Sequence, residues 1–203
     1  MLWEAAEKGA LNLLVQDEII LQLVPTLTRA WAPRGQKSPK IATKNLHSSA
    51  NNRLVVFGVI NITTGKVHRF ISSTINKETF LQAIKRINNY YRRQEPNKLT
   101  CVVIDGHPAH RSLLVKEWEK RQPNFFFYRL PKNSPELSPI EYFWRILRKE
   151  VTHNCLYGSL SALRSSLIKF FSRWANKATR FLAWVNALIK KIWSTDILNY
   201  QLG

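Results

Sequence analysis

The hydrophobic positions of this chain follow two different periods. Short runs of β-branched, aliphatic or aromatic residues, bounded by turn residues, predict strands. Five runs have this pattern: Leu11–Val15, Arg53–Thr63, Lys66–Ile71, Leu99–Ile104 and Asn124–Leu130. Thr64 and Gly65 lie between the second and third runs, so these two runs are expected to pair as a hairpin.

Apolar residues at helical spacing predict helices between and after these strands. The segment Lys77–Arg93 is amphipathic and has a basic outer face. Further helices are expected to open at Pro108, near Ser138 and at a capping Ser159, and a last basic helix is expected over Ala175–Trp193. The resulting order of strands and helices is typical of an α/β domain.

The helix that follows Ser138 has two contrasting faces. One face is apolar and is expected to point into the core: Ile140, Phe143, Trp144, Leu147 and Val151. The other face carries Glu141, Arg145 and Arg148. Ser138 and Glu141 also have the spacing of a capping box, with Pro139 at the first helical position. Capping alone can therefore explain Glu141.

The chain is strongly basic. Its 203 residues include 31 Lys and Arg against 13 Asp and Glu, a net charge of +18. This charge favours a polyanionic partner, most often nucleic acid, with an anionic membrane surface as the lesser alternative. No apolar stretch reaches the ~18–20 residues of a membrane span. Cys101 and Cys155 match neither a disulfide framework nor a zinc site, so a reducing cytosol is expected.

The few acids of so basic a chain occupy informative positions. Asp17 follows the first apolar run, Asp105 ends the run Leu99–Ile104, and Glu141 lies in the first turn of a later helix. Each acid alone has an ordinary explanation as a turn or capping residue. In a ribonuclease-H-like sheet, however, the first and fourth strands are neighbours. The three carboxylates would then converge at the edge where open α/β sheets bind ligands.

Three carboxylates in one place repel one another, and burial adds to that penalty. A divalent cation relieves the repulsion, and oxygen ligands with room for water suit Mg²⁺ or Mn²⁺ rather than zinc. Two such ions, roughly 3.5–4 Å apart, activate a nucleophile and stabilise the leaving oxygen of a phosphodiester. The pattern of acids therefore predicts a two-metal site.

Several motifs of the chain resemble those of DDE transposases of the mariner superfamily, in its bacterial insertion-sequence branch. The motifs are Gln16-Asp17-Glu18, Trp31-Ala32-Pro33-Arg34-Gly35-Gln36, Phe57-Gly58, Ile104-Asp105-Gly106-His107, and the proline-rich Leu130-Pro131 and Ser134-Pro135-Glu136-Leu137-Ser138-Pro139-Ile140-Glu141 followed by Trp144. The separation of Asp105 and Glu141 is close to that of the family. Gly106 and Ser138 stand where the family usually has Asn.

The resemblance implies an α/β fold with a ribonuclease-H-like mixed sheet flanked by helices and with extra C-terminal helices. It makes Asp17, Asp105 and Glu141 the catalytic, metal-binding triad: the aspartates bridge or flank the two ions and Glu141 completes one shell. The implied activity is a Mg²⁺-dependent endonuclease that cleaves DNA at transposon ends and transfers the strand into target DNA. Phosphates would be held by a set of basic residues: Arg34, Arg145, Arg148 and Lys149.

The resemblance also sets expectations for organisation. Residues 1–10 are expected to be the remnant of an upstream linker or helix, 11–152 the catalytic domain, and 153–203 a basic C-terminal helical extension. The active form is expected to be a homodimer, with a helix-turn-helix DNA reader on a separate reading frame, in the cytoplasm on the nucleoid. Two rival interpretations are an inactive DNA-binding relic and a ribonuclease-H-like nuclease without strand transfer. The proline-rich motif favours a transposase over a general nuclease.

Four further residues lie near the predicted triad. His107 and His110 follow Asp105, and a helix-start or phosphate-contact role is expected for them, because hard metals rarely take imidazole. Glu18 and Glu136 are acids that could replace a member of the triad, but neither occupies the matching motif position.

Overall fold

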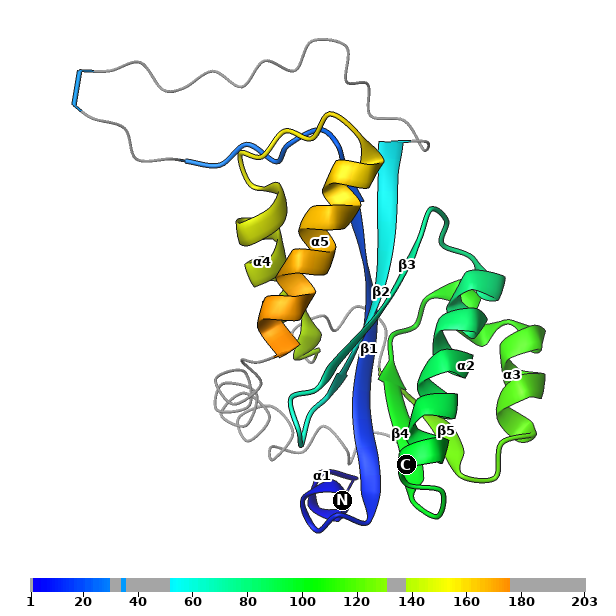
Figure 1. Ribbon diagram of the computed structural model, residues 1–203. Helices are drawn as coiled ribbons and strands as arrows, with labels where there is room; N and C mark the ends of the chain where they lie inside the picture. Colours follow the sequence, from blue (N-terminus) through cyan, green and yellow to red (C-terminus); the bar gives the residue numbers. More distant parts are fainter. Residues whose placement is uncertain (1, 30–33, 36–51, 131–137, 176–203) are drawn as a thin grey trace.

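The computed structural model describes residues 2–29, 34–35, 52–130 and 138–175, which form a mixed sheet between two layers of helices (Figure 1). The strands are β1 (Leu11–Gln22), β2 (Arg53–Asn61), β3 (Val67–Ser72), β4 (Leu99–Ile104) and β5 (Phe125–Arg129). The α-helices are α1 (Leu2–Glu7), α2 (Lys77–Gln94), α3 (Leu113–Lys120), α4 (Ile140–Leu147) and α5 (Leu160–Ala175). A 3-10 turn, η2 (Pro108–Arg111), precedes α3, and a π-helical turn, η4 (Arg148–Thr152), extends α4.

The central strand of the sheet is β1, in the order β3-β2-β1-β4-β5. It pairs antiparallel with β2 and parallel with β4, β2 and β3 form the predicted hairpin, and β4 runs parallel to β5. The mixed sheet flanked by helices confirms the predicted fold class. The predicted adjacency of the first and fourth strands is confirmed as well.

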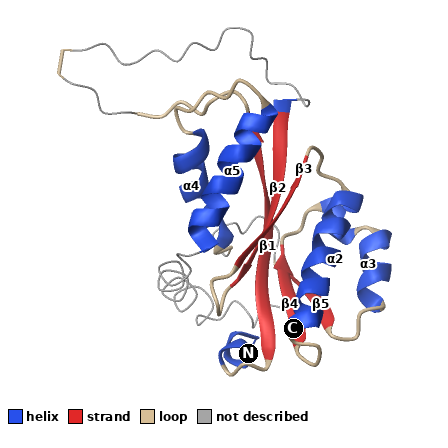
Figure 2. Ribbon diagram, viewed as in Figure 1, coloured by secondary structure: helices blue, strands red, loops and turns tan. Residues whose placement is uncertain are grey.

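The two faces of the sheet are covered by different helices, with α4 and α5 on one side and α2 and α3 on the other (Figure 2). Because side chains alternate along a strand, each strand supplies both layers. In β1, Leu13 and Val15 pack under α4 and α5, whereas Leu14 packs under α2. The apolar face predicted for α4 is fully buried, and Leu163, Leu167, Phe170 and Phe171 of α5 join the same core. The division of the chain at residue 152 stays a prediction.

The predicted end of the first strand is wrong. The strand that starts with the run Leu11–Val15 is expected to end at the acids Asp17 and Glu18, but β1 continues to Gln22, so both acids lie inside the strand. Antiparallel pairing with β2 explains the difference, since Asp17 lies opposite Gly58 and Glu18 opposite Phe57. Hydrogen bonds to a neighbouring strand hold these polar residues in an extended conformation.

Two predicted helix starts also need correction. Pro108 opens only the turn η2, because Ser112 is extended (φ −61°, ψ 150°) and α3 begins after it. The capping box of Ser138 and Glu141 is wrong as well. The N-cap of α4 is Pro139 without a side-chain hydrogen bond, and the Glu141 N–H donates instead to the Ser138 backbone carbonyl (3.2 Å).

Of the three remaining helix predictions, two are confirmed and one is untested. The helix predicted over Lys77–Arg93 is α2. The Ser159 hydroxyl accepts a hydrogen bond from the Ala162 N–H (3.2 Å), so Ser159 caps α5 as predicted. The last basic helix, Ala175–Trp193, lies almost wholly outside the described residues. Among those residues, no helix is both long enough and apolar enough to cross a membrane.

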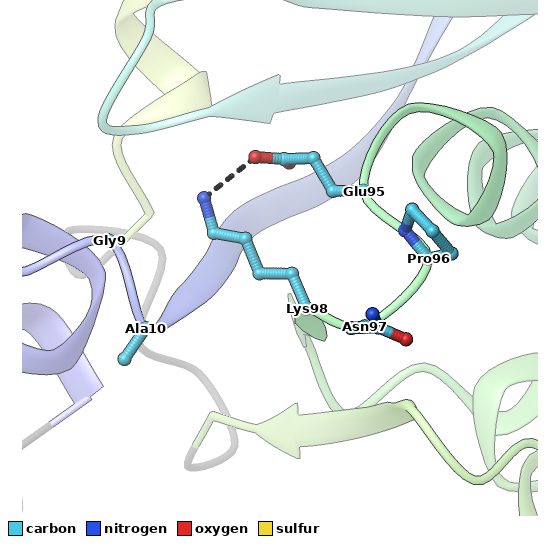
Figure 3. Close-up of a pocket in the computed structure, with 6 residues that line it drawn as sticks. All are labelled: Gly9, Ala10, Glu95, Pro96, Asn97 and Lys98. Carbon is cyan, nitrogen blue, oxygen red and sulfur yellow. Dashed lines mark hydrogen bonds and ion pairs between the residues drawn. The ribbon is translucent and has the colours of Figure 1, made fainter.

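A shallow pocket of about 390 Å³ lies where β1 and β4 begin (Figure 3). Gly9, Ala10 and the segment 95–98 line it, and an ion pair joins Lys98 to Glu95 (3.0 Å). Because β1 and β4 are parallel, this pocket is at the opposite end of β4 from Asp105. It is therefore separate from the predicted triad.

Candidate active site

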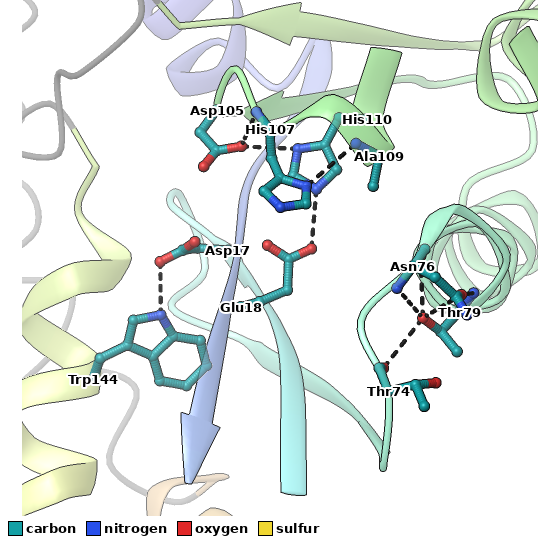
Figure 4. Close-up of polar contacts among 10 residues, drawn as sticks. All are labelled: Asp17, Glu18, Thr74, Asn76, Thr79, Asp105, His107, Ala109, His110 and Trp144. Carbon is teal, nitrogen blue, oxygen red and sulfur yellow. Dashed lines mark hydrogen bonds and ion pairs between the residues drawn. The ribbon is translucent and has the colours of Figure 1, made fainter. Parts of the chain in front are cut away.

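Asp17 and Asp105 occupy equivalent levels of two neighbouring parallel strands. The register of β1 and β4 pairs Val15 with Val103, and both valines pack under α4 and α5. Asp17 comes two residues after Val15, and Asp105 comes two residues after Val103, directly after the end of β4. The pairing of β1 with β4 thus brings the two predicted aspartates into one region of the molecule (Figure 4).

Asp17 is held by a residue from the helix above it. The Trp144 indole Nε1–H donates to Asp17 Oδ2 over 2.9 Å. The ring comes this close because Gly58, opposite Asp17 on β2, has no side chain: a Cβ there would lie 2.3 Å from Trp144 Cη2. In the sequence, Gly58 was noted only as part of a motif, and Trp144 as part of a motif and of the apolar helix face. The structure gives both a local role.

The Asp17 carboxylate carries an unfavourable negative charge. Burial raises its pKa to about 7, and the charges of Glu18 and Glu141 add to the effect. Glu141 itself is exposed in the first turn of α4, on the layer that covers Asp17. Its charge therefore acts on Asp17 from the layer of α4.

His110 connects Asp105 to a second strand. It is only 1% exposed, and its Nδ1 lies 2.9 Å from Asp105 Oδ1 while its Nε2 lies 3.0 Å from Glu18 Oε1 (Figure 4). Burial alone would lower the pKa of His110, but its contacts with Asp105 and Glu18 raise it to about 9. His110 in turn holds the pKa of Asp105 below its usual range.

His107 starts the turn after Asp105. Its backbone N–H donates to Asp105 Oδ1 (2.9 Å), and its Nδ1 accepts from the Ala109 N–H (3.3 Å) at the beginning of η2. The expected helix-start role of His107 is confirmed in this form. The bridge made by His110 was missed, because only the fold brings Glu18 within reach.

Glu18 lies on the other face of β1 from Asp17. Successive residues of a strand point to opposite faces, and Glu18 contacts His110, which stacks on Phe80 of α2 with 4.1 Å between ring centroids. Its partner is thus a histidine of the α2 layer. Glu136, the other acid considered as a substitute, lies outside the described residues.

The four basic residues expected to hold phosphates are spread over the surface. Arg145, Arg148 and Lys149 are exposed on α4 and η4, and the Arg145 guanidinium lies 5.1 Å from the centre of the Tyr142 ring. Arg34 is exposed in a turn of two described residues. The first three belong to the same layer as Glu141, so they can reach a polyanion bound beside it.

The donors at this end of the sheet fit a hard divalent cation. They are carboxylate oxygens, which Mg²⁺ and Mn²⁺ prefer, and the raised pKa of Asp17 reflects a charge that a cation would neutralise. Within the described part of the chain, no three His, Cys, Asp or Glu side chains are already close enough to form a metal site. The structure brings the triad to one region but not to ligand distance from a common point.

Comparison with known proteins gives a family for this chain. The profile of a family described as DDE superfamily endonuclease matches residues 12–164. Curated protein sequences yield no match.

Solved structures give the fold. The chain is similar to the Mos1 transposase paired-end complex with left transposon end (TM-score 0.65, 15% identity, 94% of this chain and 58% of that chain). It is also similar to the Mos1 mariner paired-end complex with Mn (TM-score 0.64, 14% identity, 94% of this chain and 59% of that chain). A third similar structure is the Mos1 catalytic domain with Raltegravir and Mn (TM-score 0.58, 13% identity, 94% of this chain and 88% of that chain). The chain thus spans 58% of the first of these chains. The likeness confirms the ribonuclease-H-like fold.

Proposed function

This chain belongs to the DDE superfamily of endonucleases, and from that membership we propose that it is a transposase catalytic domain that cleaves DNA at transposon ends and joins the freed 3′-hydroxyl to target DNA. The observation that supports the proposal is the parallel pairing of β1, which carries Asp17, with β4, which ends directly before Asp105, together with the charge of Glu141 in the first turn of α4, which acts on Asp17. Three acids from three separate segments thus lie in one region of a chain of net charge +18.

In this mechanism, Asp17, Asp105 and Glu141 hold two divalent ions, Mg²⁺ or Mn²⁺. When bound, such ions supply an activated nucleophile and stabilise the leaving oxygen of the phosphodiester. Trp144 fixes the orientation of Asp17 through its hydrogen bond to Oδ2. Arg145, Arg148, Lys149 and Arg34 bind phosphates and align the DNA with the acids.

The assembly that we propose follows from the same resemblance. Paired-end complexes of Mos1 support a dimer acting on two transposon ends. Recognition of the ends would come from a helix-turn-helix reader, and the motifs favour the bacterial insertion-sequence branch. Such a protein works in the cytoplasm, on the nucleoid.

Metal binding tests the proposal. In calorimetry with Mn²⁺, the wild-type chain should bind weakly, and an Asp17→Asn, Asp105→Asn variant should not bind. Glu117→Gln, on the exposed face of α3, is the matched control for loss of a negative charge and should bind like wild type. Undiminished binding in the double variant would place the metal elsewhere and refute the site.

Nicking of supercoiled plasmid tests the chemistry. Cleavage should require Mn²⁺ or Mg²⁺ and should disappear in the same double variant. A chain that binds metal and DNA without cutting either strand would be the inactive relic. Cleavage of transposon-end DNA without joining, after the reader is added, would identify a nuclease that lacks strand transfer.

A further inference from the structure

His110 is a buried histidine placed between two acids of different strands. Its side chain is 1% exposed, that of Glu18 is 6% exposed, and that of Asp105 is 55% exposed. The imidazole thus links an acid buried in the sheet to one that faces solvent. Neither the resemblance nor the proposed triad assigns a role to this link.

The ring of His110 is fixed on two sides. Glu18, whose β1 backbone is paired with β2, holds Nε2 at 3.0 Å, and Phe80 stacks on the ring face with 4.1 Å between centroids at an angle of 33°. Because strand β1 and helix α2 both lie in the core, these contacts leave the imidazole one orientation. Nδ1 then lies 2.9 Å from Asp105 Oδ1, as the partner of that carboxylate in an ion pair.

Both protein groups that hold Asp105 contact the same oxygen. His110 Nδ1 lies 2.9 Å from Oδ1, and the His107 backbone N–H donates to Oδ1 over 2.9 Å. The side chain nevertheless remains 55% exposed. These two contacts therefore engage Oδ1 and leave Oδ2 outside both of them.

Glu18 is badly placed to be a metal ligand in its own right. It follows Asp17 directly in β1, so its side chain leaves the opposite face of the strand. It is buried against His110 on the α2 side of the sheet. Its geometry suits a residue that orients the imidazole.

We propose that Glu18 and His110 form a positioning pair that holds Asp105 Oδ1 so that Oδ2 is directed at the metal, with Glu18 outside the metal's coordination sphere. The inference rests on the proposed function, because Asp105 must be a ligand for its orientation to matter. Removal of groups that orient metal ligands typically lowers metal affinity by about 10–100-fold. The pair is thus expected to set how tightly the site binds its cation.

The test compares the Mn²⁺ affinity of three proteins by calorimetry, with thermal melting as the measure of folding. Glu18→Gln keeps an oxygen that accepts from His110 Nε2 but removes the negative charge. The single variant His110→Phe would leave Glu18 buried without its partner and can unfold. The variant Glu18→Leu, His110→Phe removes both polar groups, keeps a ring against Phe80, and is therefore the informative one.

A second hydrogen-bonded pair provides the matched control. Asn88 and Gln122 are joined by a 3.0 Å hydrogen bond between α2 and the end of α3, away from the acids. Asn88→Leu, Gln122→Leu makes the same polar-to-apolar exchange. It should change thermal stability alone and leave Mn²⁺ affinity at the wild-type value.

The expected result is an affinity within about threefold of wild type for Glu18→Gln and a 10–100-fold loss for Glu18→Leu, His110→Phe at a comparable melting temperature. Wild-type affinity in the folded double variant would overturn the proposal. A large loss in Glu18→Gln would also overturn it, by making Glu18 a ligand. If the wild-type chain binds no Mn²⁺, the proposed function itself is wrong. Equal binding by the wild type and the double variant is a different outcome and would refute only the positioning pair.

Discussion

The indole Nε1–H of Trp144 donates a hydrogen bond to Asp17 Oδ2 over 2.9 Å, although 127 positions separate the two residues. This bond joins helix α4, which carries Glu141, to the central strand that carries Asp17. Its length depends on Gly58, where any Cβ would lie 2.3 Å from the Trp144 ring. Gly58 on strand β2 thus allows Trp144 of α4 to come within hydrogen-bond distance of Asp17.

The first prediction concerns Gly58→Ala. The added methyl group must push the Trp144 ring away, which should destabilise the protein by about 1–3 kcal/mol and weaken the bond to Asp17. Urea unfolding and Mn²⁺ calorimetry measure the two effects. Gly158→Ala is the control, because nothing lies within 4 Å of a Cβ at that position. Equal stability of the two variants would show that the contact between Gly58 and Trp144 is not tight.

Strand positions could be predicted from the sequence because they depend on local pattern. The apolar run Leu99–Ile104 is bounded by Lys98 and Asp105, and β4 has the same bounds. The end of β1 could not be predicted, because Asp17 and Glu18 stay extended through pairing with β2, which is distant in the sequence. The spacing of Ser138 and Glu141 matches a capping box, but no side-chain capping hydrogen bond forms at the start of α4. Here a local pattern predicted a contact that the fold does not make.

Part of the candidate site could likewise be predicted from the sequence, and part of it could not. That Asp17 and Asp105 lie on neighbouring strands could be expected, because the first and fourth strands are adjacent in a ribonuclease-H-like sheet. The contacts that hold them did not, because they join residues that only the fold brings together: Trp144 to Asp17, and His110 to Glu18 across 92 positions. No periodicity or motif spacing encodes such pairs without the three-dimensional packing.

The second prediction follows from the raised pKa of Asp17. It is about 7 in the folded protein against 3.8 for the ordinary group. Between these values the native state keeps a proton that the unfolded state has lost, so stability should fall as pH rises from about 4 to 7. Asp17→Asn removes this dependence. In metal-free urea unfolding it should match wild type near pH 4 and be more stable at pH 8, by at most about 4 kcal/mol.

A pH-independent difference between Asp17→Asn and wild type would contradict this account of Asp17. Addition of Mn²⁺ provides the internal control at pH 8. It should stabilise the wild-type chain, because binding to the native state shifts the equilibrium toward it, and should stabilise the variant less.

The third prediction has the opposite sign and concerns His68. Burial, aided by the charge of Lys66, lowers its pKa to about 4 from 6.5. Below about pH 6.5, His68 binds a proton in the unfolded state but stays neutral in the native state. The native state should therefore lose stability as the pH falls from 6.5 to 4, by at most about 3 kcal/mol. His68→Gln cannot take up this proton and should lose less stability over the same range in urea unfolding. Parallel losses in both proteins would assign the acid sensitivity to other groups.

The fourth prediction concerns DNA. With a net charge of +18, the chain should bind duplex DNA with little sequence preference and a steep dependence on salt. If Arg145 and Arg148 each contact a phosphate, changing both to Gln should reduce the log–log salt slope by about 2. Fluorescence anisotropy over a salt series measures the slope. Lys116→Gln, Lys120→Gln on α3 removes the same charge from the other layer and should leave the slope near wild type.

The last prediction decides the role of Glu141. Its side chain is exposed at the start of α4, and the N-cap of that helix has no side-chain hydrogen bond. Glu141→Gln should therefore change stability by no more than about 1 kcal/mol, mainly through the lost charge at a helix N-terminus. A divalent cation, however, needs the negative charge that glutamine lacks, so Mn²⁺ affinity and plasmid nicking should both collapse. Glu117→Gln, an equal change of charge on α3, should have neither effect. If Glu141→Gln nicks plasmid at the wild-type rate, Glu141 is only a residue of the helix start, and the catalytic triad proposed for this chain is wrong.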